Sequence, residues 1–491
     1  MPSKNTEKQQ PSVKPSSALR APSPAVTREK AKQSSALARR QPGEGGRRPG
    51  EGTGWPGPKS VQLFEEEQKY IAPGNQSIAL LSKLTIEKGE GCRITDVDGN
   101  SYLDLNVGVS VASLGYTHPK FVKALSEQLV RVTIGSYTTN ARLALVKLIS
   151  QIAPKGLRRT QLFSSGAEAV EAAFRLAKSI TKKKQIFGFW GGFHGKTQGT
   201  LPLSLVDWKH DVGPLMPGYQ QVMYADCYRC PLNLKVESCG LACAEMLRKQ
   251  IRATAKGDVA AVIAEPVQGT AGNIVPPDGY ISAIREIAKE EGAVYISDEM
   301  ICGFGRTGYM FGVNHDQVLP DIMTIGKAMG NGFPVSGVIT TDEHAQAKPW
   351  SLPSASSSSY GGNPFASEAV RVTAQTIVDD HLVENSARVG KILLEGIRNL
   401  QNKYEFIGDV RGRGLLIGID LVKDRRTREL LPKPLCEKFF FEGLKRGIIM
   451  MSYSPRVRIH PPLILTEAEA REAVAKMDEA FTAILPDFAK L

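Results

Sequence analysis

Two residues whose types can do chemistry, Lys327 and Asp298, each follow a short apolar run. Lys327 lies in a glycine-flanked loop directly after residues 322–325. A lysine in a tight, partly buried loop loses hydration and shifts towards its neutral, nucleophilic form. Asp298 follows the run 293–297, and ligands of open parallel sheets bind outside the carboxyl ends of the strands. Taken alone, Lys327 would be a solvated lysine, and Asp298 a helix cap or a partner in a structural ion pair.

A candidate anion site lies at Ser165, Gly166 and Ala167, where a strand pattern ends and a helix pattern begins. The first turn of a helix presents free backbone N–H groups and the positive end of the helix dipole, which together attract phosphate. Most such turns are only helix starts. The feature therefore indicates a phosphate site only in combination with others.

Two further segments supply that combination. Glu265 and Gln268 follow the apolar run 259–264, and Phe193 and His194 lie in a loop. A helix N-terminus for phosphate, an amine that forms a Schiff base, a carboxylate that keeps a ring nitrogen protonated and an aromatic ring that stacks are what pyridoxal 5′-phosphate requires. The residues together predict a site for this cofactor, with no metal in it.

The apolar runs also predict the elements that position these side chains. Residues 259–264 and 293–297 have the composition of buried parallel strands, and a helix pattern covers 281–291 between them. Strand, helix and strand in this order imply a right-handed crossover and an α/β sheet. A hairpin with an Asp-Gly turn is predicted over 92–105, and a capping signature at 466–469 begins a last amphipathic helix.

From residue 65 to 485 the sequence resembles the class III pyridoxal-phosphate aminotransferases of fold type I, the group of the ω-amino-acid, 4-aminobutyrate, ornithine and acetylornithine enzymes. The strings that carry the resemblance are Asp96-x-Asp-Gly-x-x-Tyr-Leu-Asp104, Ser165-Gly-Ala-Glu-Ala-Val-Glu171, Phe193-His-Gly195, Glu265-Pro-Val-Gln-Gly269, Asp298-Glu-Met-Ile-Cys-Gly-Phe-Gly-Arg-Thr-Gly308, Gly326-Lys327, Tyr360-Gly-Gly-Asn-Pro364, Val410-Arg-Gly-Arg-Gly-Leu415 and Arg458-x-x-Pro-Pro462. The resemblance implies an α/β fold: a large domain on a mostly parallel, seven-stranded type of sheet flanked by helices, plus a smaller α+β domain. The expected divisions are a disordered basic tail (1–60), a segment joining the small domain (61–114), the cofactor-binding domain (115–370) and the C-terminal small domain (371–491).

By this resemblance Lys327 is the Schiff-base lysine and Asp298 pairs with the pyridine nitrogen. The other cofactor-binding residues that it implies are Ser165, Gly166 and Ala167 at the phosphate, Phe193 stacked on the ring, Gln268 near the phenolic oxygen, and His194 and Glu265. Ser359 stands where the family usually has a threonine whose hydroxyl reaches the phosphate of the neighbouring subunit. The resemblance therefore implies a homodimer.

The reaction that the resemblance implies moves an amino group from an amine or amino acid, with an ω-amine favoured, to a 2-oxo acid such as 2-oxoglutarate or pyruvate. Arg411 matches an arginine that grips a substrate carboxylate with its planar fork, and Lys196 replaces a common family arginine. Thr270 replaces the glutamate of the 4-aminobutyrate and ornithine enzymes, and Met300-Ile301 replaces Val-Gln, which disfavours a strict 4-aminobutyrate or ornithine assignment. An amino-acid racemase or epimerase, or a decarboxylating or phospho-lyase variant, has the same cofactor motifs and stays open.

Composition and charge bound the remaining possibilities. With 42% hydrophobic and 23% charged residues, the chain is globular in type, and no apolar run reaches the about 18 residues of a membrane span. The net charge of +12 is concentrated in residues 1–60, which carry 12 basic and 4 acidic residues. This Pro-, Ser- and Gly-rich segment predicts disorder. Transit-peptide function, or non-specific contact with nucleic acid or anionic lipid, stays open for the tail; no specific nucleic-acid partner and a cytoplasmic location are expected.

Four of the seven cysteines are clustered in the sequence. Cys227, Cys230, Cys239 and Cys243 have the spacing x2, x8 and x3, which a zinc knuckle can use. The lack of a secretory signal favours reduced thiols. Packed thiols without metal, a structural zinc ion and a disulfide are the three alternatives.

Overall fold

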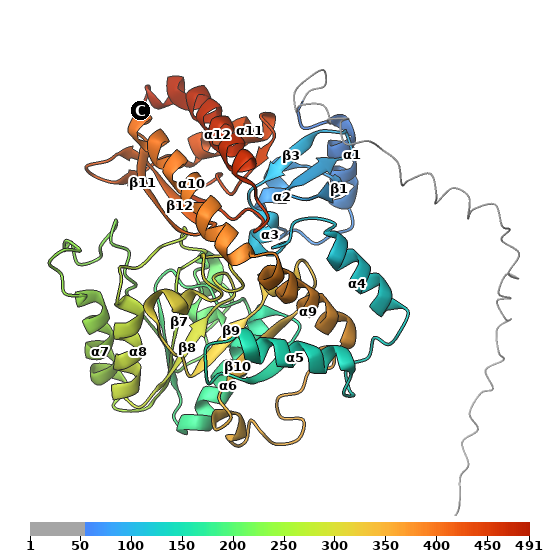
Figure 1. Cartoon of the computed structure of the whole chain (residues 1–491). Coiled ribbons are helices and arrows are strands. Elements are labelled where there is room, and N and C mark those ends of the chain that lie inside the picture. Colours follow the sequence, from blue (N-terminus) through green and yellow to red (C-terminus); the bar gives the residue numbers. More distant parts are fainter. Residues whose placement is uncertain (1–54) are drawn as a thin grey trace, which may run out of the picture. The chain divides into compact units, whose positions relative to one another are not determined.

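A computed structural model describes residues 55–491 (Figure 1). Its helices are α1 (Pro58–Glu67), α2 (Ser77–Ser82), α3 (Val107–Ser110), α4 (Pro119–Leu129), α5 (Asn140–Ile152), α6 (Gly166–Thr181), α7 (Ala242–Thr254), α8 (Tyr280–Glu290), α9 (Pro364–Asp379), α10 (Leu382–Lys403), α11 (Lys433–Lys445) and α12 (Glu467–Phe488). Its strands are β1 (Ile86–Glu90), β2 (Arg93–Asp96), β3 (Ser101–Asp104), β4 (Arg159–Phe163), β5 (Gln185–Phe189), β6 (Tyr219–Val222), β7 (Val259–Ala264), β8 (Val294–Asp298), β9 (Ile322–Ile325), β10 (Ser336–Thr340), β11 (Ile407–Arg413), β12 (Leu416–Asp424), β13 (Glu429–Leu430), β14 (Ile448–Ile449) and β15 (Arg456–Ile459). None of the helices among these residues is long and apolar enough to cross a membrane.

The central element is a seven-stranded sheet in the order β4-β10-β9-β8-β7-β5-β6. Strand β10 is antiparallel to both of its neighbours, whereas the other neighbouring pairs are parallel. The predicted α/β architecture with a mostly parallel sheet is confirmed. Because β4, β5, β7, β8 and β9 run in the same direction, their carboxyl ends meet at one edge of the sheet, which is where ligands of such sheets bind.

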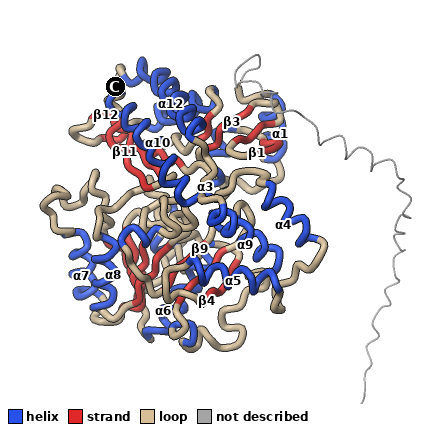
Figure 2. The backbone as a smooth tube through the Cα atoms, viewed as in Figure 1, coloured by secondary structure: helices blue, strands red, loops and turns tan. Residues whose placement is uncertain are grey.

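The strands of this sheet are buried on both faces, as their near-continuous apolar runs predict. In β7, Val262 and Ala264 belong to one hydrophobic core, which includes residues of α7 and α8. Ala261 and Ile263 belong to a second core with α6. Figure 2 shows α7 and α8 beside each other and next to the strands. The helices thus cover the two faces and leave the loops at the carboxyl edge free to form a site.

A second sheet, in the order β1-β2-β3-β14, contains the predicted hairpin. Its turn is at Asp98-Gly99, where Gly99 has φ +90°, a conformation that glycine adopts without steric cost. The parallel pairing of β3 with β14 joins the N-terminal segment to residues from the C-terminal part of the chain. A third sheet contains β11, β12 and β13, with β15 paired to β12.

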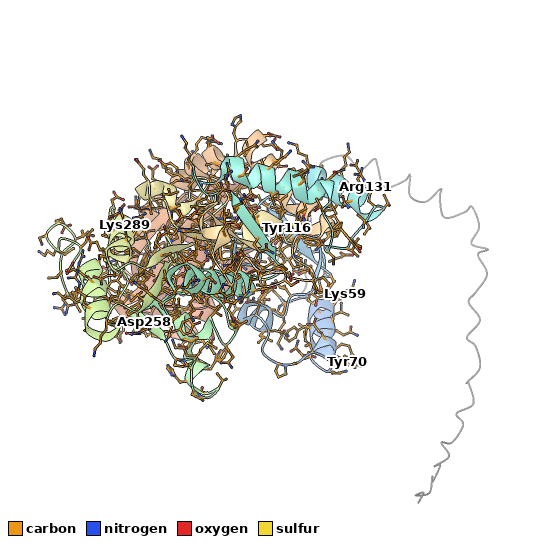
Figure 3. All side chains as sticks on the ribbon, turned by 90° about the horizontal axis from the view of Figure 1, so that it is seen from below. Lys59, Tyr70, Tyr116, Arg131, Asp258 and Lys289 are labelled. Carbon is orange, nitrogen blue, oxygen red and sulfur yellow. The ribbon has the colours of Figure 1, made fainter. Side chains whose placement is uncertain are left out.

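Residues 1–54 of the predicted tail (1–60) lie outside the described residues. From Trp55 onwards the chain packs, because Trp55 Nε1 donates to the Tyr102 hydroxyl at 3.1 Å and α1 begins at Pro58. The Asp98 carboxylate accepts the backbone N–H groups of Lys59 and Ser60. Figure 3 labels Lys59 and Tyr70, near the two ends of α1. The folded chain therefore begins before the predicted boundary at residue 60.

The boundary predicted at 370/371 falls within α9. The described residues 55–491 belong to one compact unit, so the division into 115–370 and 371–491 stays a prediction. The capping signature at 466–469 is confirmed, since Thr466 and Glu469 cap the start of α12 reciprocally.

Candidate active site

The candidate site is assembled from the carboxyl ends of neighbouring strands. Lys327 follows β9 and Asp298 ends β8, and these strands pair with Asp298 opposite Thr324. A Cβ atom placed on Gly326 would lie 2.5 Å from Met300 Sδ, and one on Gly166 would lie 3.2 Å from it. Met300 therefore packs between the loop that carries Lys327 and the start of α6. Sheet topology brings together three features that are far apart in sequence.

Asp298 forms the most buried polar pair of the site, with His194. The Asp298 Oδ2 and His194 Nδ1 atoms are 2.6 Å apart, and both side chains are inaccessible to solvent. Asp298 Oδ1 accepts from Met300 N and Thr324 Oγ1, both at 3.1 Å. Burial disfavours a charged imidazole, but the hydrogen bond and charge of Asp298 outweigh it and raise the His194 pKa. These contacts fix the Asp298 carboxylate at the end of β8.

Glu265 holds the loops after β5 and β7 together. Its two carboxylate oxygens accept from Phe193 N at 2.9 Å and Gly269 N at 3.0 Å. Burial raises the Glu265 pKa, while the charge of His194 opposes this rise. Gln268 Nε2 donates to the Trp190 carbonyl at 2.9 Å. These contacts place half-buried Phe193, and Gln268, at the same edge of the sheet as Asp298.

The N-terminus of α6 retains donors for an anion. Ser165 is the N-cap, and its hydroxyl accepts from Glu168 N at 3.3 Å. Among the described residues, no acceptor bonds the N–H groups of Gly166 and Ala167, as expected for a first helical turn. A Cβ atom on Gly195 would lie 2.5 Å from Ala167 Cβ. The Phe193–Gly195 loop thus packs directly on this turn, and only glycine fits there.

Lys327 is held by its backbone, and its amine is free of partners within the part of the chain that is described. Its φ is +42°, a left-handed conformation that a residue with a side chain rarely adopts. The next residue, Ala328, accepts a hydrogen bond from Ser113 Oγ at 2.6 Å. No hydrogen bond or ion pair of Lys327 Nζ occurs within residues 55–491. The backbone thus positions Lys327, while its Nζ atom makes no ion pair with these residues.

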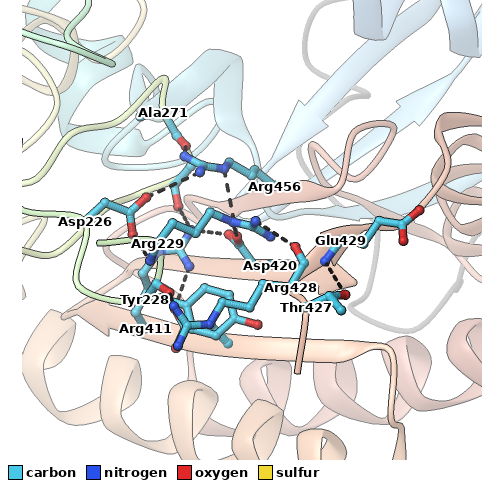
Figure 4. Close-up of polar contacts among 12 residues, drawn as sticks. Asp226, Tyr228, Arg229, Ala271, Arg411, Asp420, Thr427, Arg428, Glu429 and Arg456 are labelled. Carbon is cyan, nitrogen blue, oxygen red and sulfur yellow. Dashed lines mark hydrogen bonds and ion pairs between the residues drawn. The ribbon is translucent and has the colours of Figure 1, made fainter. Parts of the chain in front are cut away.

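Arg411 is occupied by the protein itself, contrary to what a free carboxylate-binding fork requires. Its guanidinium donates to Asp409, Asp420 and the Gly272 and Asn273 carbonyls at 2.6–3.2 Å. Figure 4 shows Arg411, Arg229 and Arg456 around Asp420. Burial favours a protonated Asp420, but these arginines outweigh it and lower the Asp420 pKa. In this arrangement Arg411 joins β11 and β12 to the loop at Gly272.

Arg458 was given no role from the sequence. In the structure it lies close enough to Glu265 for the charge of that carboxylate to raise the Arg458 pKa. Arg458 is partly buried on β15, and its guanidinium has no hydrogen-bond acceptor among residues 55–491. Burial lowers the Arg458 pKa, and the charges of Tyr453 and Glu265 oppose this. An unpaired arginine in such a place calls for an anion. The string Arg458-x-x-Pro-Pro462 is the sequence signal that could have identified it.

A second feature missed from sequence is the turn formed by α3. Val107, Gly108, Val109 and Ser110 have φ of 40°, 68°, 65° and 65°, which makes it left-handed. Each such non-glycine residue costs about 1–3 kcal/mol. The neighbouring Leu114 N donates to Asn331 Oδ1, in the loop after Lys327. Backbone strain of this kind concentrates at functional sites.

The structure does not bring all predicted residues into contact. Lys196 and Ser359 are exposed, and Thr270 is half-buried. No hydrogen bond joins their side chains to the residues above within 55–491. Their roles stay predictions.

Comparison with known proteins identifies the family. The family model of class-III aminotransferases matches residues 74–481. The chain belongs to this family. It is 34% identical to the acetylornithine aminotransferase of Methanopyrus kandleri over 82% of this chain and 95% of that enzyme, and 32% identical to the leucine/methionine racemase of Thermococcus litoralis over 80% and 89%. The structure of an amine transaminase from an uncultivated Pseudomonas species superposes with a TM-score of 0.80 at 29% identity, covering 84% of this chain and 98% of that one.

Class III aminotransferases depend on pyridoxal 5′-phosphate, and the residues present here fit that cofactor. The unbonded N–H groups of Gly166 and Ala167 suit its phosphate. The buried carboxylate of Asp298 suits a protonated ring nitrogen, and the unpartnered amine of Lys327 suits its aldehyde. The predicted family, the α/β fold of type I and the predicted cofactor are thereby confirmed.

Proposed function

We propose that this enzyme transfers an amino group from an amine or amino acid, with ω-amines as the favoured donors, to a 2-oxo acid such as 2-oxoglutarate or pyruvate. The observation that carries the proposal is the meeting of Lys327, Asp298 and the start of α6 around Met300. An unpaired amine, a fixed carboxylate and an anion cradle at one sheet edge are the groups that transamination uses.

Pyridoxal 5′-phosphate, when bound, supplies an electron sink for the carbon from which a proton is removed. Asp298 would hold a proton on the ring nitrogen, with His194 fixing the carboxylate. Lys327 Nζ would bind the aldehyde carbon and, once released, move a proton at the substrate carbon as a general base and acid. Phe193 and Gln268 would orient the ring, since Glu265 holds their two loops together.

We propose Arg458, rather than the predicted Arg411, as the group that binds a substrate carboxylate. Arg411 already uses four of its N–H groups within the chain. Arg458 has no such partners among residues 55–491. The charge of Glu265 acts on Arg458, and it would partly balance the guanidinium charge when the bound substrate has no carboxylate next to Arg458. Lys196 is exposed and would contribute only long-range attraction.

We further propose that the enzyme is a homodimer in the cytoplasm, without a specific nucleic-acid partner. Ser359 and the neighbouring Tyr360 are exposed, Tyr360 by 74%. Val130 and Ile134 are 85% and 55% exposed in the segment after α4. A Cβ atom on Gly135 would lie 3.3 Å from Asn363, so the two segments are neighbours, and apolar side chains exposed near one another favour a subunit interface.

The experiment that tests the function is the Lys327→Ala variant. Borohydride reduction followed by peptide mass spectrometry should find the cofactor attached to Lys327 in the wild type, and an amine panel with both acceptors should show turnover that the variant lacks. Lys256→Ala is the matched control, because Lys256 also has a positive φ (47°) but lies at an exposed site. Full turnover in Lys327→Ala would refute the proposal.

Amino-acid racemisation or epimerisation is the alternative, favoured by the 32% identity to the leucine/methionine racemase. The two reactions differ in their need for an acceptor. Racemisation of a single enantiomer proceeds without a 2-oxo acid, whereas transamination stops after one turnover per site. Chiral analysis of L-amino acids incubated without acceptor therefore separates them.

A further inference from the structure

The clustered cysteines do not form a ligand site as the structure places them. Cys227, Cys230, Cys239 and Cys243 line one small cavity, and all four are free thiols. No three histidine, cysteine or acidic side chains within residues 55–491 are placed to hold a metal ion. The arrangement is that of thiols packed against apolar residues.

Strand β15 and the residue after it direct three polar side chains towards one loop. Arg456, Arg458 and His460 are at alternate positions, which share one face of a strand. Arg456 Nη1 donates to the Ala271 carbonyl at 2.8 Å, and His460 Nε2 lies 3.0 Å from Asn273 Oδ1. Both contacts reach the loop between β7 and α8. Arg458, which has no acceptor among the described residues, therefore lies between two side chains that hold this loop.

The loop packs directly against the strand next to Arg458. Gly418 of β12 is paired with Arg458, and a Cβ atom on Gly418 would lie 2.3 Å from the Gly272 carbonyl oxygen and 3.2 Å from Asn273 Cβ. Asn273 Nδ2 donates to the Ile417 carbonyl at 2.7 Å. Because neighbouring strands are only about 4.8 Å apart, the acceptors of the loop lie within the reach of an arginine side chain at this position.

Other donors already bond the acceptors of residues 271–273. Arg456 bonds the first carbonyl, and Arg411 Nη2 and Nε bond the next two, at 2.7 Å and 3.2 Å. The remaining acceptor of this stretch, Asn273 Oδ1, is bonded by His460. Each acceptor near the unpaired arginine thus has a donor of its own.

His460 makes its contact as a neutral imidazole. Asn273 Nδ2 is the donor to Ile417, so Oδ1 is the acceptor and the proton lies on His460 Nε2. Nδ1 then has no proton, and it is buried without a partner among the described residues. Burial lowers the His460 pKa, and the positive charges around it, that of Arg458 first, lower it further. The residue next to Arg458 on this face therefore donates a hydrogen bond without adding a second cation.

We propose that His460 is a positioning residue that keeps Arg458 available for a substrate carboxylate. The proposal rests on the substrate role proposed above for Arg458. Without the proton of His460, Asn273 Oδ1 would be a buried acceptor that lacks a donor, which is unfavourable. The guanidinium of Arg458, unpaired on the same face, would then turn to this oxygen and away from the substrate.

The test measures carboxylate recognition by the enzyme loaded with pyridoxal 5′-phosphate in two ways. Kinetics with an alkylamine donor and a 2-oxo acid acceptor give kcat/KM for each substrate separately, because each value reports one half of the reaction. Titration with pentanoate, a carboxylate that has no amine to react, gives a dissociation constant without turnover when it is followed by the absorbance of the cofactor.

Three variants separate the two nitrogen atoms of the imidazole. His460→Phe leaves Asn273 without a donor, and so does His460→Asn, whose amide ends at the position of Nδ1. Both should lower kcat/KM for the 2-oxo acid and weaken pentanoate binding about tenfold, with kcat/KM for the alkylamine changed less than about twofold. His460→Gln is the matched control, because its amide reaches the position of Nε2, and it should keep the wild-type values.

A double variant tests the capture of Arg458 directly. Adding Asn273→Gly to His460→Phe removes the oxygen that would capture Arg458, and glycine tolerates the φ of 53° at this position. The double variant should therefore recover the 2-oxo acid kinetics and the pentanoate affinity that His460→Phe loses. A residue that only stabilised the fold would instead give a double variant weaker than either single one.

Three results would overturn the proposal and leave the proposed aminotransferase function intact. They are unchanged carboxylate recognition in both His460→Phe and His460→Asn, a His460→Gln variant as defective as His460→Phe, and a double variant that recovers nothing. Arg458→Met is measured alongside. If it binds pentanoate as the wild type does, the proposed role of Arg458 fails together with this proposal, whereas the aminotransferase function itself stands or falls with Lys327→Ala.

Discussion

Replacing Asp298 by asparagine should destabilise the cofactor-free protein in a pH-dependent way. The substitution keeps the size of the side chain and leaves Oδ1 able to accept from Met300 N and Thr324 Oγ1. It removes the charge that lies 2.6 Å from His194 Nδ1. Without that charge, burial and the charge of Lys327 lower the His194 pKa, and only the charge of Glu265 still opposes them.

The sign of the pH dependence follows from this change. In the wild type the raised His194 pKa contributes stability that is fully present below the unfolded value of about 6.5 and is lost as the pH rises through the folded value. A buried hydrogen bond to a charged group contributes about 3 kcal/mol, and a neutral one about 1 kcal/mol. We therefore expect Asp298→Asn to lose about 3 kcal/mol near pH 5.5 and about 1 kcal/mol near pH 9.

Urea unfolding at pH 5.5, 7 and 9 measures this difference, at one protein concentration because association shifts apparent stability. Thr324→Val is the control, since it removes one donor to Asp298 but no charge. It should lose about 2 kcal/mol at every pH, because it removes one hydrogen bond to a carboxylate. A loss for Asp298→Asn that is constant or grows with pH would show that the charge of Asp298 does not act on His194 as described.

Three further outcomes follow from the contacts of the site and of the N-terminus. Gly195→Ala should weaken cofactor binding about tenfold or more in a spectroscopic titration, because its φ is +128° and the new Cβ would collide with Ala167, at about 1–2 kcal/mol for the backbone alone. Gly213→Ala has the same kind of backbone (φ +97°) but open space, so cofactor affinity should stay unchanged. Arg458→Met should raise KM for substrates with a carboxylate about 10- to 150-fold. Arg411→Met should instead lower the free energy of unfolding by about 3 kcal/mol, because it leaves buried carboxylates without their partner. If Arg411→Met raised KM and Arg458→Met lowered the stability in urea, the substrate role would return to Arg411. Trp55→Ala should lower the unfolding free energy by about 2 kcal/mol, because Trp55 bonds Tyr102 and packs on Phe441, and an unchanged urea midpoint would mean that this contact is not made in solution.

Much of the scaffold could be predicted from local pattern. The apolar runs at 259–264 and 322–325 coincide with β7 and β9, because strands buried on both faces need continuous apolar side chains. The capping box at Thr466 and the Asp-Gly turn of the hairpin are equally local, since a side chain or a positive φ satisfies them within a few residues. Lys327, Asp298 and Ser165 stood out for the same reason: each follows a strand pattern directly.

Which arginine is free could not be read from the sequence. Arg411 and Arg458 both stand in family strings, and their residue types are identical. Only the fold brings Asp420 and the Gly272 carbonyl to Arg411 while leaving Arg458 without an acceptor among residues 55–491. The availability of a charged group depends on partners that are distant in sequence.

The amino-acid sequence by itself determined the strands, the turns that end them and the types of side chain that follow them. This is because the hydrophobic pattern, helix capping and turn conformation each depend on only a few neighbouring residues. Tertiary structure decided which of those groups meet. Met300 between the Lys327 loop and α6, His194 against Asp298, and four thiols around one cavity all join residues from separate elements. Such contacts are set by sheet order and packing, which no local pattern contains.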